Sequence, residues 1–349
     1  MDDGVFVSPV VFVSRPVVER NIERYHARFK CSSVALRAHV KGHRTVELAR
    51  FQEAAGASGI AVHTTAEARR YLASGITDIV LAWPLISPER WSFFADFSAF
   101  ADARGATVSA HVGDPDAVRQ LGVLCTAAGT DLALRIDVHF DDRGIAPERV
   151  LDLARLVETT PGVHLDGVTG YWGPATDDEV RNWDECGRAM ARTLVEVAGE
   201  VRADGMTCPT VAVGGTPNAL AVLDVPGVTE VCGGAYALWD SGSAEAGLCT
   251  LEDVAVSVRA TVLDVADGAI RTDADELLAD ASQDWAPEIV AVRADGTPFT
   301  EARAGEVVDL IPAHLCPFVK KAGQLVVTDD DGRPEGKWDT LYFGQETNR

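Results

Sequence analysis

The amino-acid sequence predicts an α/β protein in which a (β/α)8 barrel of the TIM type is followed by an all-β domain. Two observations carry this prediction. From residue 16 onward, short β-branched or apolar runs alternate with amphipathic helical stretches, which is typical of parallel βα units. After Tyr236 this alternation stops, and the chain shows period-two alternation with Asp-Gly turns instead.

The first helix is predicted at 16–29, where apolar residues from Val18 to Phe29 recur at helical spacing and Pro16 stands near the start. Thr45 is expected to cap the next helix, Gly56 to follow its end, and Pro147 to stand near the start of a later one. Eight strands are expected at 33–38, 59–63, 78–82, 107–112, 131–138, 164–170, 210–214 and 229–233. Eight strands over about 220 residues fit a closed barrel, with a doubly wound open sheet as the alternative.

The predicted second domain is discontinuous in sequence. The run VSPVVFVS precedes the first barrel helix and has no βα partner, so we expect it to join the C-terminal strands. The predicted boundaries are therefore 15–240 for the barrel, and 1–14 together with 241–349 for the β-domain.

Composition narrows the function classes. The 349 residues are 47% hydrophobic and carry a formal net charge of −22, so we expect a globular protein without a nucleic-acid partner or an anionic membrane surface as partner. No window approaches the roughly 18–20 apolar residues of a membrane span, and the acidic N-terminus does not resemble an export signal. The seven scattered cysteines lack a CxxC motif, which favours reduced thiols and a cytoplasmic location.

Polar residues and glycines cluster where the barrel strands are expected to end, which is where barrels of this type build their active sites. His39 and Lys41 follow the first strand, His111 the fourth, His139 the fifth and Tyr171 the sixth. Glycine-rich stretches follow the last two strands and contain Gly215, Thr216, Gly234, Ala235 and Tyr236. One such stretch alone would indicate a tight turn, but two on adjacent strands favour a phosphate site made of backbone N–H groups.

Lys41 is expected at the same barrel mouth as this phosphate site. A lysine there could be an ordinary surface residue, or it could form an imine with an aldehyde cofactor. Phosphate and lysine together suggest pyridoxal phosphate. His314 and Cys316 are spaced i, i+2, which on an extended segment places both side chains on one face, and imidazole with thiolate suits Zn²⁺. Taken alone, this pair is a weak signal and fits a hydrogen-bonded histidine beside a buried thiol better.

Several motifs resemble those of one enzyme family. The segment RAHVKGHRTVELARFQEAAGASGIAVHTTAEA resembles RPHxKTHK…Q…GA.GI.VAT..EAE, RIDVHFDDRGI resembles EIDxGxxRxGV, and VGGTPN resembles GGTPT. EVCGGAYALWD resembles LRPGxYxxxD, and PAHLCPFV resembles PNHxCPTVN. These patterns are typical of the D-serine dehydratase and D-threonine aldolase family, a branch of the alanine-racemase-like fold type III enzymes, and they extend along nearly the whole chain.

The resemblance implies a role for individual residues. It implies that Lys41 is the Schiff-base residue. It also implies that Gly215, Thr216, Gly234 and, as a further candidate, Tyr236 hold the cofactor phosphate. Arg143 would lie near the phenolic oxygen and Tyr171 near the ring. We expect His39 and Ala235 to contribute to the same cofactor site. It also implies a Zn²⁺ ion, or another divalent metal, on His314 and Cys316, and a homodimer.

The implied reaction is loss of water from a D-configured β-hydroxy amino acid, giving a 2-oxo acid and ammonia, with the metal binding the β-hydroxyl. The D configuration follows from the resemblance alone. Pro174 stands where many members carry a histidine, which counts against retro-aldol cleavage. His111 and His139 stand where small residues are usual; they either transfer protons or only form local hydrogen bonds. The alternatives are a D-threonine-type aldolase, an amino-acid racemase, and a non-catalytic pyridoxal-phosphate carrier.

Overall fold

The computed structural model describes residues 6–83, 87–140, 144–173, 176–266, 269–284, 286, 289–297 and 299–341. Eight parallel strands form a closed barrel in chain order. They are β2 (Ala35–His39), β3 (Ile60–Val62), β4 (Asp78–Leu81), β5 (Thr107–Val112), β6 (Leu132–Val138), β7 (Val163–Tyr171), β8 (Thr210–Gly214) and β9 (Glu230–Gly233). The barrel closes where β2 pairs with β9, which places Ala35 opposite Glu230. All eight predicted strands are confirmed, and the closed order excludes the open-sheet alternative.

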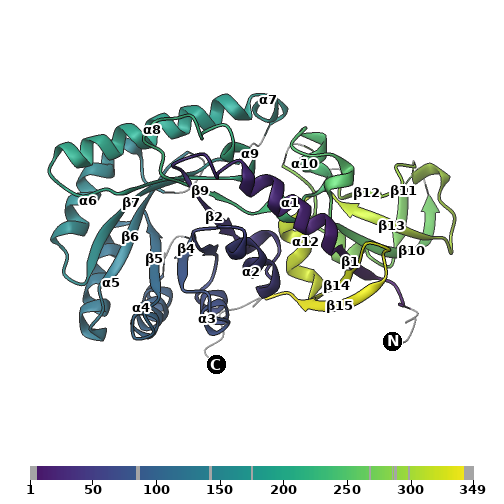
Figure 1. The fold of residues 1–349 in the computed structure, drawn as a ribbon, viewed down its shortest axis with the longest axis horizontal. Helices are drawn as coiled ribbons and strands as arrows, with labels where there is room; N and C mark the ends of the chain where they lie inside the picture. Colours follow the sequence, from purple (N-terminus) through teal and green to yellow (C-terminus); the bar gives the residue numbers. More distant parts are fainter. Residues whose placement is uncertain are drawn as a thin grey trace.

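Helices surround the barrel, and their ends follow the expected signals (Figure 1). They are α1 (Arg15–Ala27), α2 (Val46–Ala54), α3 (Thr65–Ala73), α4 (Pro88–Asp102), α5 (Pro115–Ala128), α6 (Val150–Thr159), α7 (Asp177–Arg181), α8 (Trp183–Ala203) and α9 (Thr216–Ala219). Thr45 caps α2 by accepting a hydrogen bond from the Leu48 backbone N–H, and Gly56 follows that helix with a φ of 106°. Pro147 begins a 3-10 turn (Pro147–Arg149) that leads directly into α6.

The rest of the described chain forms a mixed sheet beside the barrel, with strand order β12-β13-β10-β1-β14-β15 and β11 paired with β10. The strands are β1 (Val10–Ser14), β10 (Val256–Ala266), β11 (Ala269–Thr272), β12 (Ala291–Arg293), β13 (Val307–Pro312), β14 (Gln324–Thr328) and β15 (Pro334–Asp339). The N-terminal strand β1 lies antiparallel to β10 and parallel to β14.

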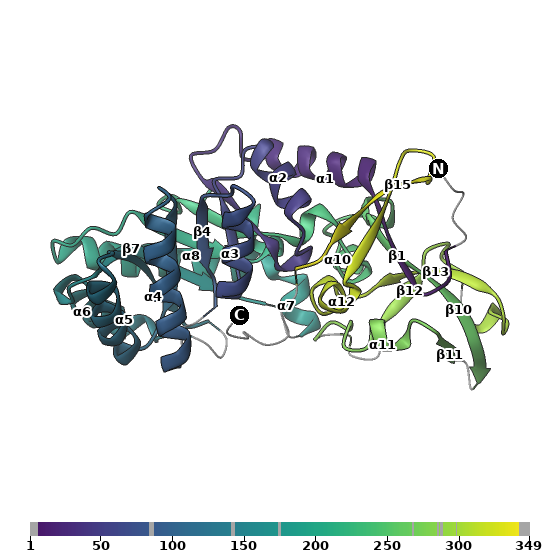
Figure 2. The ribbon, with the colours of Figure 1, turned by 90° about the horizontal axis from the view of Figure 1, so that it is seen from below.

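This sheet unit is not purely β, which corrects the sequence-based expectation. It carries the helices α10 (Ser241–Glu245), α11 (Asp275–Leu278) and α12 (Leu315–Ala322). Figures 1 and 2 show α10 and α12 at the junction between the barrel and the sheet. In α12 the apolar residues Leu315, Phe318 and Val319 are buried at helical spacing, and two lysines occupy the last turn. Period-two alternation in the neighbouring strands concealed this short helix.

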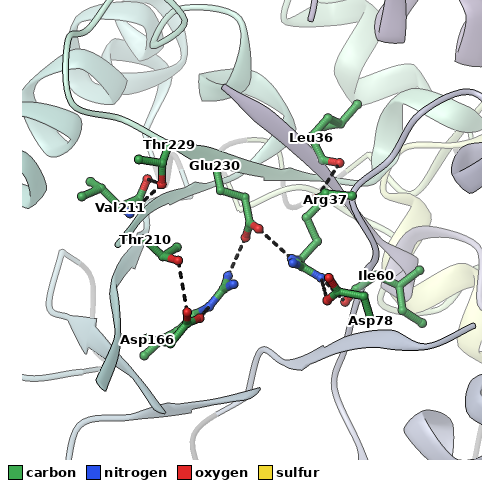
Figure 3. Close-up of polar contacts among 11 residues, drawn as sticks. Leu36, Arg37, Ile60, Asp78, Asp166, Thr210, Val211, Thr229 and Glu230 are labelled. Carbon is green, nitrogen blue, oxygen red and sulfur yellow. Dashed lines mark hydrogen bonds and ion pairs between the residues drawn. The ribbon is translucent and has the colours of Figure 1, made fainter. Parts of the chain in front are cut away.

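The half of the barrel nearest the amino ends of its strands is closed by paired charges, of which Arg37, Arg135 and Glu230 are buried (Figure 3). Glu230 accepts hydrogen bonds from Arg37, at 2.9 Å, and from Arg135, at 2.5 Å. Arg37 also pairs with Asp78, and Arg135 with Asp166. Burial alone would lower the pKa of Arg37, but the negative charges of Glu230 and Asp78 raise it above its ordinary value. We call these five residues the floor network.

Candidate functional site

A cavity opens at the opposite end of the barrel, where the strands terminate at the junction with the sheet unit. It brings together residues that are distant in sequence. Its walls come from the ends of β2, β7, β8 and β9 and from the segments around α10 and α12, and they include His39, Lys41, Gly42, Tyr171, Gly173, Gly215, Thr216, Pro217, Cys232, Gly234, Ala235, Asp240, Ser243, Leu248, Gln283, Asp284, His314 and Cys316. Most of the residues predicted for the cofactor, and both predicted metal ligands, therefore share one cavity.

Lys41 lies in a 3-10 turn (Val40–Gly42) that directly follows β2. Its Nζ lies 4.8 Å from the centroid of the Tyr171 ring, which comes from the end of β7. The His39 side chain accepts a hydrogen bond from the Lys41 backbone N–H. Burial lowers the pKa of His39 well below its ordinary value, and the charges of Lys41, His63 and His111 act in the same direction. A neutral imidazole therefore supports the turn that bears the lysine.

The turns after β8 and β9 form a cradle of backbone groups. The Thr216 hydroxyl accepts hydrogen bonds from the backbone N–H groups of Gly234, at 3.0 Å, and Ala235, at 3.1 Å. Gly215 has a φ of 109°, which favours glycine. A Cβ on Gly234 would lie 1.9 Å from the His39 carbonyl oxygen, so only glycine fits there. A hydroxyl beside clustered backbone N–H groups in glycine-rich turns fits a phosphate group.

Tyr236 does not line this cavity, which corrects the prediction that it contacts the phosphate. Its side chain is fully buried behind the turn that follows β9. There the phenol stacks on Tyr25 with ring centroids 4.0 Å apart. Its hydroxyl forms hydrogen bonds with His26 and Gln52. Both partners of the hydroxyl, His26 and Gln52, are residues that do not line the cavity.

His314 and Cys316 lie together, although not on the extended segment that the sequence suggested. His314 is the N-cap residue of α12, and Cys316 is in the first turn of that helix. Burial lowers the pKa of His314, but its hydrogen bond to Cys316 and the charges of Cys316 and Asp240 raise it overall. Burial raises the pKa of Cys316, but the hydrogen bond to His314 and the charge of Lys41 lower it overall. A thiol whose pKa is lowered beside an imidazole fits a soft divalent cation such as Zn²⁺.

His314 and Cys316 line the cavity together with the carboxylates of Asp240 and Asp284. No group of three or more His, Cys, Asp or Glu side chains with metal-site geometry occurs among the described residues. A metal held by His314 and Cys316 alone would keep coordination positions for a substrate, as catalytic metal sites require.

Asp240 is a site residue that the sequence reasoning did not single out. One carboxylate oxygen accepts a hydrogen bond from the Ser243 backbone N–H, and the other accepts one from the Leu315 N–H, at 2.9 Å. Leu315 stands between His314 and Cys316, so Asp240 ties that segment to the end of the barrel. Gln283 also supports the segment that bears His314, because its amide donates a hydrogen bond to the Ala313 carbonyl at 2.7 Å. The signal was present, because Asp240 is the last residue of the motif GGAYALWD.

Two of the remaining predicted residues, His111 and His139, do not line the cavity. His111 ends up near His39, on whose pKa its charge acts, but does not line the cavity. His63, whose ring lies 4.9 Å from that of His39, extends this group of imidazoles. His139 is exposed just beyond β6. Arg143 and Pro174 lie outside the described residues.

Two further predictions concern cysteines and membrane segments. All seven cysteines are free thiols, of which Cys125 and Cys208 are buried and Cys31 is exposed. Across the described residues, no helix is both long and apolar enough to span a bilayer.

These features define a recognisable class of fold. It is a (β/α)8 barrel with a lysine after its first strand, a phosphate-type cradle after its last two strands and an added mixed sheet. The family model for the alanine racemase N-terminal domain matches residues 13–237. The chain therefore belongs to this family.

Individual relatives agree with this assignment. The chain is 33% identical over 264 residues to a D-threo-3-hydroxyaspartate dehydratase from Delftia sp. (strain HT23), covering 73% of this chain and 67% of the relative. It is 29% identical to a D-threonine aldolase from Arthrobacter sp., covering 67% and 61%. The chain thus spans about two thirds of the length of these curated relatives.

Solved structures extend the likeness over the whole fold. The structure of the Delftia dehydratase has a TM-score of 0.81 at 26% identity and covers 97% of this chain and 98% of its own. A cysteine-to-alanine mutant of that dehydratase, solved in the metal-free form, is equally similar. A D-threonine aldolase from Filomicrobium marinum has a TM-score of 0.80 at 20% identity, covering 96% and 95%, and shows the shared fold.

Proposed function

We propose that this protein is a lyase that removes water from a D-configured β-hydroxy amino acid, using pyridoxal phosphate and a divalent metal ion. The products are a 2-oxo acid and ammonia; the water lost by elimination is regained when the C=N bond is hydrolysed. One observation carries the proposal: the Lys41 amine shares a single cavity with a phosphate-type cradle and with the His314–Cys316 pair. The similarity to a hydroxyaspartate dehydratase supports it.

The residues present fit pyridoxal phosphate. Thr216 and the N–H groups of Gly234 and Ala235 would hold the phosphate, the Lys41 amine would bind the aldehyde, and Tyr171 would lie beside the ring. When bound, the cofactor supplies an electron sink for negative charge at the substrate Cα. Arg143 at the phenolic oxygen stays a prediction.

The metal would be held by His314 and Cys316, with Asp240 fixing the backbone between them. We propose Zn²⁺, because the two ligands are an imidazole and a thiol. At the substrate it would supply Lewis-acid assistance to departure of the β-hydroxyl. The metal-free form of the cysteine mutant of the Delftia dehydratase supports a metal at the corresponding kind of site.

The remaining chemistry falls to side chains of this chain. With the cofactor bound, the Lys41 amine would serve as the base that takes the substrate Cα proton. The neutral His39 holds the backbone of the Lys41 turn and so keeps the amine near Tyr171. The aromatic face of Tyr171 excludes water from one side of that amine. His111 and His139 as proton-transfer groups stay predictions.

A D-threonine-type aldolase is the second candidate, because a D-threonine aldolase is among the relatives and the lysine and metal pair would serve it equally. Racemase and non-catalytic carrier functions are less well supported, since neither uses the His314–Cys316 pair.

The deciding experiment is a panel of D- and L-β-hydroxy amino acids assayed with and without Zn²⁺. We expect a 2-oxo acid and ammonia from D substrates, with activity lost after chelation and restored by metal. Glycine plus an aldehyde would instead establish the aldolase. Activity unaffected by chelators and a product of inverted configuration would establish a racemase.

We further propose that the chain has two domains. The barrel domain comprises residues 15–240, and the sheet domain combines residues 1–14 with 241–349. The pairing of β1 with β10 and β14 supports this division. A homodimer and a cytoplasmic location stay predictions.

A further inference from the structure

A chain of buried hydrogen bonds runs behind the cavity and has no part in the chemistry described above. It links His43, Gln52, Tyr236 and His26, of which the first three are fully buried and the last is 3% exposed. His43 follows the turn that bears Lys41, and Tyr236 follows Gly234 and Ala235 of the phosphate-type cradle. Gln52 on α2 and His26 on α1 complete the chain. It therefore joins the two turns that would grip opposite ends of the cofactor.

The first links of this chain can run in only one direction. A backbone N–H can only donate, so the 3.1 Å hydrogen bond from the Thr45 N–H makes His43 Nδ1 an acceptor. Burial lowers the pKa of His43 to about 4, so the ring is neutral at pH 7 and its single proton is on Nε2. That proton is donated to Gln52 Oε1 at 3.0 Å. The orientation of the Gln52 amide is thereby fixed.

The remaining links follow from that orientation. Gln52 Nε2 donates to the Tyr236 hydroxyl oxygen at 2.9 Å, and the Tyr236 hydroxyl donates to His26 Nε2 at 2.8 Å. Burial lowers the pKa of His26 to about 4, so the ring carries a single proton at pH 7. Because Nε2 accepts the hydrogen bond from Tyr236, that proton is on Nδ1, which donates to the backbone of Ala55. Every donor meets an acceptor, which is what a buried polar chain needs to be stabilising.

The two turns also touch directly. A Cβ built on Gly42 would lie 3.4 Å from the Gly234 carbonyl group, and one on Gly234 would overlap the His39 carbonyl. Tyr236 stacks on Tyr25, whose hydroxyl donates to the Thr216 carbonyl. The glycine contacts bring the two turns together, and the hydrogen-bond chain adds directional links between them.

We propose that Gln52 is a positioning residue for the cofactor: its amide joins the Lys41 turn to the Gly234–Tyr236 turn and sets their separation. This inference rests on the proposed function, because the separation matters only if one ligand is held by both turns. Gln52 itself touches neither the cavity nor any substrate.

The direction of these hydrogen bonds can be tested without any substitution. Nitrogen-15 NMR of the wild-type apoprotein at pH 7 reports which ring nitrogen of each histidine bears the proton. We expect the Nε2–H form for His43 and the Nδ1–H form for His26, with the exposed His164 as an internal reference. The opposite form of either buried ring would overturn the proposed direction.

The positioning role is tested by Gln52→Glu, which keeps the shape of the side chain but cannot donate to Tyr236. The control is Gln120→Glu, an exposed glutamine on α5. We expect the dissociation constant for pyridoxal phosphate to rise by about tenfold or more in Gln52→Glu, as loss of one buried hydrogen bond predicts. The imine absorption band at saturating cofactor should also weaken or shift. A purely structural role would lower only the melting temperature of the apoprotein.

Tyr236→Phe is a second variant, since it keeps the stacking on Tyr25 and removes the hydroxyl; it should weaken cofactor binding in the same way. If wild type forms the imine band and Gln52→Glu and Tyr236→Phe both bind the cofactor as tightly as Gln120→Glu, the positioning role is wrong while the proposed function stands. If wild type forms no imine band at all, the proposed function fails, and this inference fails with it.

Discussion

The two ends of the barrel are built from the same strands but from opposite kinds of residue. On β2, Arg37 belongs to the floor network and His39 to the cavity; on β9, Glu230 belongs to the floor and Cys232 to the cavity. The floor uses paired full charges that cannot move without leaving a charge buried. The mouth uses glycines, backbone N–H groups and the neutral imidazole of His39, which leave room for a charged ligand. Stability is therefore expected to depend on the floor and cofactor binding on the mouth.

The largest expected effect concerns the floor. Glu230→Ala leaves Arg37 and Arg135 buried without their shared partner, so the free energy of unfolding should fall by roughly 3–5 kcal/mol. Denaturant titration measures this, with Glu200→Ala on the exposed face of α8 as the control. Cofactor affinity of the folded fraction should stay unchanged. A change in affinity as large as the change in stability would show that the two ends are not separable.

The second effect concerns acid. The pKa values of His26 and His43, both about 4 in the folded protein, lie below the ordinary value. The unfolded chain therefore binds more protons than the folded one as pH falls from about 6.5 toward 4, and stability is lost over that window. Between pH 7 and pH 5 we expect a loss of about 2 kcal/mol per histidine.

Denaturant titrations at the two pH values test this. In His26→Gln the pH-dependent loss should shrink by the share of one histidine, whereas Gln120→Ala, at an exposed position without a titrating group, should leave it unchanged. A loss that is the same in all three proteins would mean that His26 is not held neutral.

The third prediction contrasts two facing glycines at the mouth. Gly234→Ala should displace the backbone of the cradle, because its Cβ would overlap the His39 carbonyl, and overpacking of this kind costs about 1–3 kcal/mol. Gly42→Ala should change much less, since its Cβ would meet Gly234 at an ordinary contact distance. Cofactor titration of both variants measures the difference. Equal affinities would mean that the close approach at Gly234 does not shape the cradle.

The smallest expected effect concerns Asp240. In Asp240→Asn one of the two oxygens that accept backbone N–H bonds becomes a nitrogen, so the segment between His314 and Cys316 is held less firmly. We expect Zn²⁺ affinity to fall by about 10–100-fold, as is usual for residues that orient metal ligands. Competition with a chelator measures this, and the exposed Asp116→Asn on α5 is the control. Unchanged affinity would show that Asp240 has no such role.

The barrel was predictable because each strand is a short, fully buried run whose signal is local. The cavity residues after those strands were predictable for the same reason, since parallel strands all end at one face. The start of α12 was not, although Pro317 in its first turn and the lysines in its last are helix signals. The i, i+2 spacing of His314 and Cys316 suggested a strand, and the helix cap brings them together by a different geometry.

The position of Tyr236 was not predictable from its motif. Its hydroxyl faces His26 and Gln52, which lie 210 and 184 residues away in sequence, so only the folded chain shows that it points away from the cavity. Asp240 illustrates the same limit, because its partner Leu315 is 75 residues further along. A motif can mark such a residue, as it does Asp240, without showing which distant residue it contacts.

The most direct test of the central claim is chemical trapping at Lys41. Protein saturated with pyridoxal phosphate would be reduced with borohydride, digested and mapped by mass spectrometry. We expect the reduced phosphopyridoxyl group on the peptide that contains Lys41, and its absence from that peptide in Lys41→Ala. An unmodified Lys41 in saturated wild-type protein would contradict the account.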